Sequence, residues 1–175
     1  WGILALVVGL GVLTPHPQLL QYLLLTSGAW ALFLAFGGVG TEKLTRDAAL
    51  KRLGLALGAV VLGAAIGAIQ FLPVREYVAW SPRAGGRDYA YATSYSLPLE
   101  EVINFYLPQF SGLLDKYWGR NGIHFHSEYV GAAVIVLATG AFGGWNGARR
   151  RVLVFWTGVG LVTLLWGLGG STPFF

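Results

Sequence analysis

The residues with the clearest potential for chemistry lie between positions 74 and 128. Near the end of this stretch, His124, His126 and Glu128 alternate with other residues. Alternate residues of an extended chain point to one face, so two imidazoles and a carboxylate would face one divalent metal ion such as zinc. The alternative, which we favour, is that these side chains only form hydrogen bonds near the membrane surface.

Four arginines form a second candidate site, for a lipid or a phosphate. They are Arg75, Arg83, Arg87 and Arg120. Guanidinium groups bind phosphate oxygens through paired, charge-assisted hydrogen bonds. The alternative, which we again favour, is ion pairing with Glu76, with Asp88 and with lipid headgroups. The sequence has no Cys, no phosphate-binding glycine loop and no nucleophile-elbow motif.

The composition indicates that membrane helices position these side chains. Of the 175 residues, 55% are hydrophobic and only 11% are charged, against about 25% charged in soluble domains. Mean hydropathy is +0.59. Residues 1–41, 53–72, 129–148 and 152–175 contain no Asp, Glu, Lys or Arg. Uncharged runs of about 18 or more residues are typical of transmembrane helices, so we predict an all-α, multi-pass bundle forming a single membrane domain.

Five transmembrane spans are expected. They cover residues 1–13, 18–37, 53–72, 129–145 and 152–169. Prolines 15 and 17 separate the first two spans, and Pro73 is expected to close the third, because proline interrupts helical hydrogen bonding. Small residues at helical spacing predict close helix packing. They are Gly54, Gly58, Gly63, Gly67, Gly140 and Gly144. Packing within the bundle is favoured over a docking face for another subunit.

The distribution of basic residues predicts the orientation. Loops 38–52 and 146–151 hold seven of the twelve Lys and Arg residues, and alternating spans place both loops on one side. The positive-inside rule assigns that side to the cytoplasm. Residues 14–17 and 74–128 are then extracytoplasmic, which fits a bacterial inner-membrane protein. The net charge of +4 is attributed to this orientation, and no nucleic-acid partner is expected.

The predicted outer segment, residues 74–128, is rich in Tyr, Trp and Phe. Such rings favour the headgroup region, although they could also form a platform for a sugar. A short interfacial helix is expected from Pro98 to Leu107. Its apolar face would carry Leu99, Val102, Ile103 and Tyr106. Glu100 and Glu101 would favour the positive end of the helix dipole.

Several strings in this chain resemble the bacterial YfhO-like membrane protein family. They are Gly11 to Tyr22, Gln70 to Pro73 with Ser81 to Arg83, Ala92 to Glu101, Tyr117 to Gly119, Tyr129 to Gly131 and Gly170 to Pro173. That family resembles GT-C glycosyltransferases. The resemblance implies sugar transfer from a polyprenyl-phosphate donor at the outer membrane face. The usual GT-C catalytic carboxylate follows the first span, where the Thr14 to Pro17 turn has none, so this chain is expected to be a non-catalytic internal fragment.

A second function stays open beside that resemblance. The chain could be a structural transmembrane subunit of a larger respiratory or photosynthetic complex. It would then contact other transmembrane subunits and bind lipid or pigment at its periphery. Transport is disfavoured, because the predicted spans contain no Asp, Glu, Lys or Arg that ion or proton pathways usually need.

Overall fold

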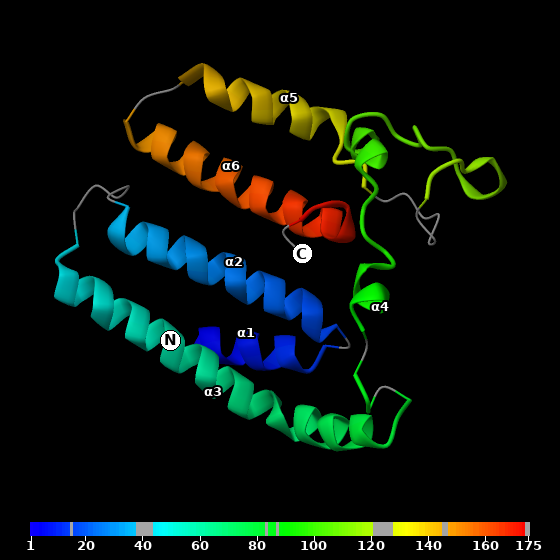
Figure 1. The fold of residues 1–175 in the computed structure, drawn as a ribbon. Helices are drawn as coiled ribbons and strands as arrows, with labels where there is room; N and C mark the ends of the chain where they lie inside the picture. Colours follow the sequence, from blue (N-terminus) through cyan, green and yellow to red (C-terminus); the bar gives the residue numbers. More distant parts are fainter. Residues whose placement is uncertain are drawn as a thin grey trace. The chain divides into compact units, whose positions relative to one another are not determined.

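The structure is a computed structural model that describes residues 1–14, 16–37, 44–82, 84–86, 88–120, 128–144 and 147–173. Every regular element in these ranges is a helix, so the predicted all-α fold class is confirmed for this part of the chain (Figure 1). The chain divides into two compact units, Trp1–Gly86 and Arg87–Phe175. Each unit is described separately below.

The first unit contains three helices, α1 (Gly2–Val12), α2 (Pro17–Phe36) and α3 (Arg46–Ala79). Pro17 occupies the first turn of α2, where its missing N–H would have no partner in any case. At the start of α3, Thr45 Oγ1 accepts a hydrogen bond from the Ala48 N–H at 3.3 Å. This cap fixes the beginning of α3 next to Asp47, whose charge favours the positive helix end.

Helix α3 is longer than the sequence predicted. It has 34 residues, which corresponds to about 51 Å, whereas a bilayer core is about 30 Å thick. Pro73 lies inside the helix, so the expectation that it ends this helix is wrong. A proline removes one backbone N–H, but long membrane helices accommodate that loss locally. The helix instead ends at Ala79, and it carries Arg75 and Glu76 beyond its apolar stretch.

Helices α1 and α3 form the main packing contact of the first unit. The Trp1 indole donates to the Leu55 carbonyl oxygen, and Gly58 lies beside the Trp1 ring. A β-carbon built on Gly63 would lie 2.6 Å from both the Ala5 carbonyl oxygen and Val8 Cβ. The absence of a side chain therefore allows the two backbones to approach closely.

In its described residues, the second unit contains both α-helices and short 3₁₀ helices. Its α-helices are α4 (Tyr89–Thr93), α5 (Ala132–Ala141) and α6 (Gly147–Leu168). Its 3₁₀ helices are η1 (Leu99–Phe105), η2 (Leu114–Lys116), η3 (Phe142–Gly144) and η4 (Gly169–Ser171). Helix α4 was not predicted. Asp88 caps its start, because the Asp88 Oδ1 accepts the Tyr91 N–H at 2.9 Å.

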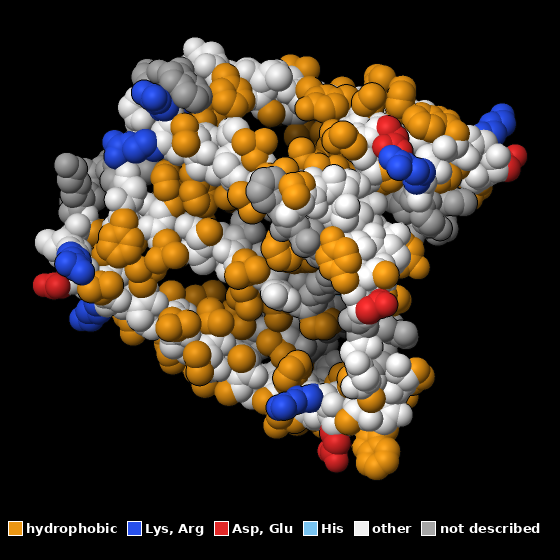
Figure 2. Space-filling view, viewed as in Figure 1, with side chains coloured by type: hydrophobic (Ala, Val, Ile, Leu, Met, Phe, Trp, Pro, Cys, Tyr) orange, Lys and Arg blue, Asp and Glu red, His pale blue; other side chains and the backbone are white. Residues whose placement is uncertain are grey.

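Among the described residues, three helical stretches are long and apolar enough to cross a membrane. They are Pro17–Phe36, Arg46–Ala79 and Gly147–Ser171. The apolar helices Gly2–Val12 and Ala132–Gly144 are shorter, so the count of five spans stays a prediction. Figure 2 shows hydrophobic side chains along the visible helices, with acidic and basic side chains near loops and helix ends. These exposed apolar surfaces fit a lipid environment.

Candidate functional site

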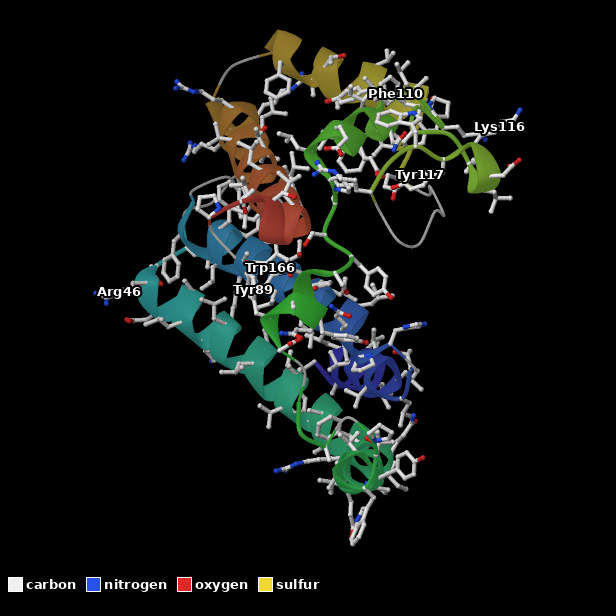
Figure 3. All side chains as sticks on the ribbon, turned by 45° about the vertical axis from the view of Figure 1, so that its right-hand side comes forward. Arg46, Tyr89, Phe110, Lys116, Tyr117 and Trp166 are labelled. Atoms are coloured by element: carbon white, nitrogen blue, oxygen red, sulfur yellow. The ribbon has the colours of Figure 1, made fainter. Side chains whose placement is uncertain are left out.

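The candidate site is the segment from residue 98 to residue 120, which we call the cap segment. It contains η1 and η2 and the turns that join them. Figure 3 shows Phe110, Lys116 and Tyr117 on this segment, with Lys116 at its outer tip. The predicted short helix is present here, but it is a 3₁₀ helix and ends at Phe105 rather than at Leu107.

The 3₁₀ form of η1 changes which residues face inward. A 3₁₀ helix has three residues per turn, so residues at spacing three lie in one row. Pro98, Glu101 and Asn104 form such a row, and all three are buried. The predicted apolar face points the other way, because Leu99, Ile103 and Tyr106 are all exposed. A polar row therefore occupies the inside of this small element.

Glu101 is the centre of the polar row. Its side chain is fully buried, and its Oε1 accepts hydrogen bonds from the Tyr117 hydroxyl and, at 3.2 Å, from the Arg120 backbone N–H. A buried carboxylate is tolerated only when such donors replace water. The enclosure of this carboxylate favours a structural role over direct contact with a substrate. From the sequence, we predicted only that Glu101 favours the positive end of the helix dipole, and we did not predict these hydrogen-bond partners.

Gly119 is required for the approach of Tyr117 and Arg120 to Glu101. A β-carbon built on Gly119 would overlap both Glu101 Oε1 and the Tyr117 hydroxyl. Gly112 adopts a φ of +78°, where a side chain would also overlap the Lys116 carbonyl group. Both glycines therefore have a steric reason to lack a side chain in this fold.

Asn104 continues the buried polar row. Its Nδ2 donates to Ser111 Oγ at 2.8 Å, and its Oδ1 accepts the Ser111 N–H at 3.2 Å. The Ser111 carbonyl oxygen in turn accepts the Trp118 N–H at 3.0 Å. Trp118 Nε1 donates to the Phe110 carbonyl oxygen, and the two rings pack edge to face with centroids 5.6 Å apart. These contacts fold the chain back from η1 to Trp118.

A surface ion pair joins the beginning and the end of the cap segment. Arg120 donates from Nε and from its terminal nitrogen to the two carboxylate oxygens of Glu100, at 2.7 and 2.8 Å. Hydrogen bonds from the Arg120 side chain lower the pKa of Glu100 to about 2, and the same pairing raises the pKa of Arg120. Because the pair is largely exposed, its effect on stability is screened by water.

Three hydrogen bonds attach the cap segment and the two residues before it to the segments around α6 and α5. The Leu97 N–H donates to the Gly167 carbonyl oxygen at 2.8 Å, in the last turn of α6. The Gly170 N–H donates to Ser96 Oγ at 3.1 Å. On the other side, the Val130 N–H donates to the Phe105 carbonyl oxygen at 3.3 Å, just before α5. The segment is thus held at the end of α6 and the beginning of α5.

The four predicted arginines differ in their placement. Arg75 is exposed on α3, in the first unit. Arg120 is in the second unit, where its guanidinium binds Glu100. Arg83 and Arg87 lie outside the described residues.

Of the three residues predicted to bind a metal, only Glu128 is among the described residues, and its side chain is half-buried. His124 and His126 lie outside the described residues. Within the described ranges, no group of three or more His, Asp or Glu side chains could hold a metal ion. The His124, His126 and Glu128 proposal is therefore still a sequence-based prediction.

The glycines predicted to pack helices have different surroundings. Gly58, Gly63 and Gly67 of α3 face α1, where a β-carbon on Gly67 would overlap Val12. Gly54 and Gly140 have open space where a β-carbon would lie. Gly144 lies against the Arg149 side chain, with its built β-carbon 2.5 Å from an Arg149 terminal nitrogen.

Comparison with protein-family models, with curated proteins and with solved structures found no match to this chain.

Proposed function

We propose that this chain is a membrane-embedded part of a YfhO-like, GT-C-like envelope protein. The full-length protein would transfer sugars from a polyprenyl-phosphate donor at the outer face of a bacterial inner membrane. The chain itself would supply a scaffold beside the reaction and no catalytic carboxylate. Loops 38–52 and 146–151 would lie in the cytoplasm, and residues 14–17 and 74–128 outside it.

The observation that carries this proposal is that strings underlying the resemblance meet in the second unit. Glu101, which ends one string, accepts the hydroxyl of Tyr117 from the next. Ser96, which lies in the string Ala92 to Glu101, accepts the N–H of Gly170 from the last string, although 74 positions separate the two residues. These short motifs therefore share one local structure. Because these motifs form one local structure, they are better read together than as separate short matches.

Two features support a non-catalytic role for the chain itself. Glu101 is the fully buried carboxylate of the cap segment, and Tyr117 and Arg120 already bind its Oε1. Glu100 is bound through both oxygens by Arg120. Neither group is poised to remove a proton from a substrate hydroxyl, which requires direct access. Arg75, exposed beyond the apolar part of α3, is the better candidate for a donor phosphate.

Photocrosslinking of the full-length protein tests this proposal. A photoreactive polyprenyl phosphate should label residues 74–128 in a saturable way, and unlabelled polyprenyl phosphate should compete. Arg75→Ala should weaken that labelling about tenfold, the loss of one charge-assisted phosphate contact of roughly 1.5 kcal/mol. Arg46→Ala, at the other end of α3, is the matched control and should leave it unchanged. The absence of saturable labelling would contradict the proposal.

A structural subunit of a larger membrane complex is the second candidate. It is favoured by α2, in which no residue is buried. Several of its large side chains are exposed, among them Leu19, Leu23 and Leu32. Purification in mild detergent discriminates the two functions. Fixed stoichiometry with pigment-bearing or cofactor-bearing proteins supports the subunit, and loss of that stoichiometry on mild washing counts against it.

A further inference from the structure

We propose that the cap segment, residues 98–120, seats its apolar side in the bilayer interface at the Leu168 end of α6. The partner is the boundary between lipid headgroups and acyl chains. This inference requires only that α6 crosses the bilayer, and it does not depend on sugar transfer. It assigns a membrane-binding surface to a segment that lies outside the apolar helices.

The position of the cap segment follows from its contacts with α6. Helix α6 and η4 together form the stretch Gly147–Ser171, which is long and apolar enough to cross a membrane, and Leu168 lies near the end of this stretch. Leu97 hydrogen-bonds to Gly167 in the last turn of α6, and η1 begins only two residues later, at Leu99. The segment therefore starts at the level where a membrane-spanning α6 meets the headgroups.

The charges near η1 are arranged so that entering the interface costs little. Glu101 is buried inside the segment with donors on its carboxylate. Glu100 and Arg120 neutralise each other through two hydrogen bonds. An unpaired charge would be costly to move out of water. Glu100 and Arg120 form a pair with no net charge, and the two donors to Oε1 replace part of the water that Glu101 would otherwise bind. The charged residues Asp115 and Lys116 belong to η2, and Figure 3 shows Lys116 at the outer tip of the cap segment.

Outside the buried row, η1 carries exposed apolar side chains next to the Glu100–Arg120 pair, because spacing three places Glu100 in one row with Ile103 and Tyr106. Leu99 is 66% exposed, Ile103 41% and Tyr106 60%. Trp118 is 55% exposed while its indole N–H is bound to Phe110, which lowers the cost of placing the ring near acyl chains. An apolar side of this kind, with Tyr and Trp at its margin, matches the chemistry of the bilayer interface.

Site-specific fluorescence quenching tests the proposal on the whole chain. The sequence has no Cys, so one introduced cysteine can carry an environment-sensitive fluorophore without background labelling. Ile103→Cys reports on the apolar side, and Asp115→Cys on η2 is the matched control. Leu99→Cys and Tyr106→Cys are parallel reporters in case one variant fails to fold. The proteins would be placed in nanodiscs of phosphatidylethanolamine and phosphatidylglycerol, with nitroxide groups near the headgroups of some lipids.

The label at position 103 should be quenched by nitroxide lipids roughly threefold more than the label at 115, because interfacial helices bury their apolar side by about 5–10 Å. Aqueous iodide should show the reverse order. Equal lipid quenching at 99, 103, 106 and 115 would overturn the proposal. Protection from iodide at 103 without lipid quenching would also overturn it, because the apolar side would then pack against protein instead.

Discussion

At the residue scale, the stability of the cap segment depends on a buried carboxylate and on the groups that satisfy it. Glu101 has no access to water, and the Tyr117 hydroxyl is one of its two described donors to Oε1. From the sequence, we predicted the same role for Glu100 and Glu101, which was to interact with the positive end of the helix dipole. The structure separates them, since one is enclosed and the other forms a surface ion pair.

Tyr117→Phe should destabilise the cap segment by about 1–3 kcal/mol, because it removes a donor from a buried carboxylate. The measurement is the rate of tryptic cleavage after Lys116 and Arg120 in detergent micelles, which should rise. Tyr95→Phe removes a hydroxyl from an exposed ring of the same unit and should leave the rate unchanged. Equal rates for wild type and Tyr117→Phe would show that this hydrogen bond contributes nothing.

The Glu100–Arg120 pair should make the cap segment sensitive to acid. The pKa of Glu100 is lowered from 4.5 to about 2, so its stabilising effect is present above about pH 4.5 and is lost as the pH falls towards 2. Glu100→Gln should therefore flatten the fall of the thermal midpoint over this range, measured by tryptophan fluorescence. Arg120→Gln should flatten it similarly. A wild-type profile in both variants would contradict the assignment.

At the element scale, the sequence predicted positions of helices better than their type and ends. The interfacial helix was predicted from a period of 3.6 residues, which placed Val102 with Ile103 and Tyr106. The actual period of η1 is that of a 3₁₀ helix, so the row of Pro98, Glu101 and Asn104 faces inward. Sequence alone could not favour this arrangement, because the partners of Glu101 and Asn104 come from residues 111–120.

The glycines of α3 illustrate a second limit of sequence reasoning. Four of them share a similar spacing, but Gly63 and Gly67 meet α1, whereas Gly54 faces open space. Spacing identifies a smooth helix surface, and only the neighbouring helix determines which part of that surface is used. Pro73 shows the same limit. The hydrophobic pattern could not tell whether Pro73 ends the helix or lies within it, and the structure places it within α3.

Gly67→Leu should disrupt the contact between α1 and α3, because a β-carbon at Gly67 already overlaps Val12. We expect a loss of about 1–3 kcal/mol, the usual range for overpacking. The measurement is unfolding in mixed micelles with increasing dodecyl sulfate, followed by far-UV ellipticity. Gly54→Leu is the matched control, since no atom lies within 4 Å of its built β-carbon. Equal losses in the two variants would contradict the packing contact.

At the scale of the whole molecule, the distribution of charges predicted most of the helices. The charge-free stretches 1–41, 53–72, 129–148 and 152–175 contain or overlap the five longest helices of the described residues. This succeeds because an apolar stretch must satisfy its own backbone hydrogen bonds, and a helix does so locally. The cap segment was harder to predict, because its folding depends on contacts between residues far apart in sequence, such as Ser96 with Gly170.

The central claim is that the chain crosses a bilayer with loops 38–52 and 146–151 on one side and residues 74–128 on the other. Labelling single cysteines with a membrane-impermeant maleimide in intact bacterial cells tests it most directly. Asp47→Cys and Ala148→Cys should be labelled only after the membrane is permeabilised, whereas Asp115→Cys should be labelled before. Labelling of positions 47 and 148 from opposite sides, or of all three positions without permeabilisation, would contradict the claim.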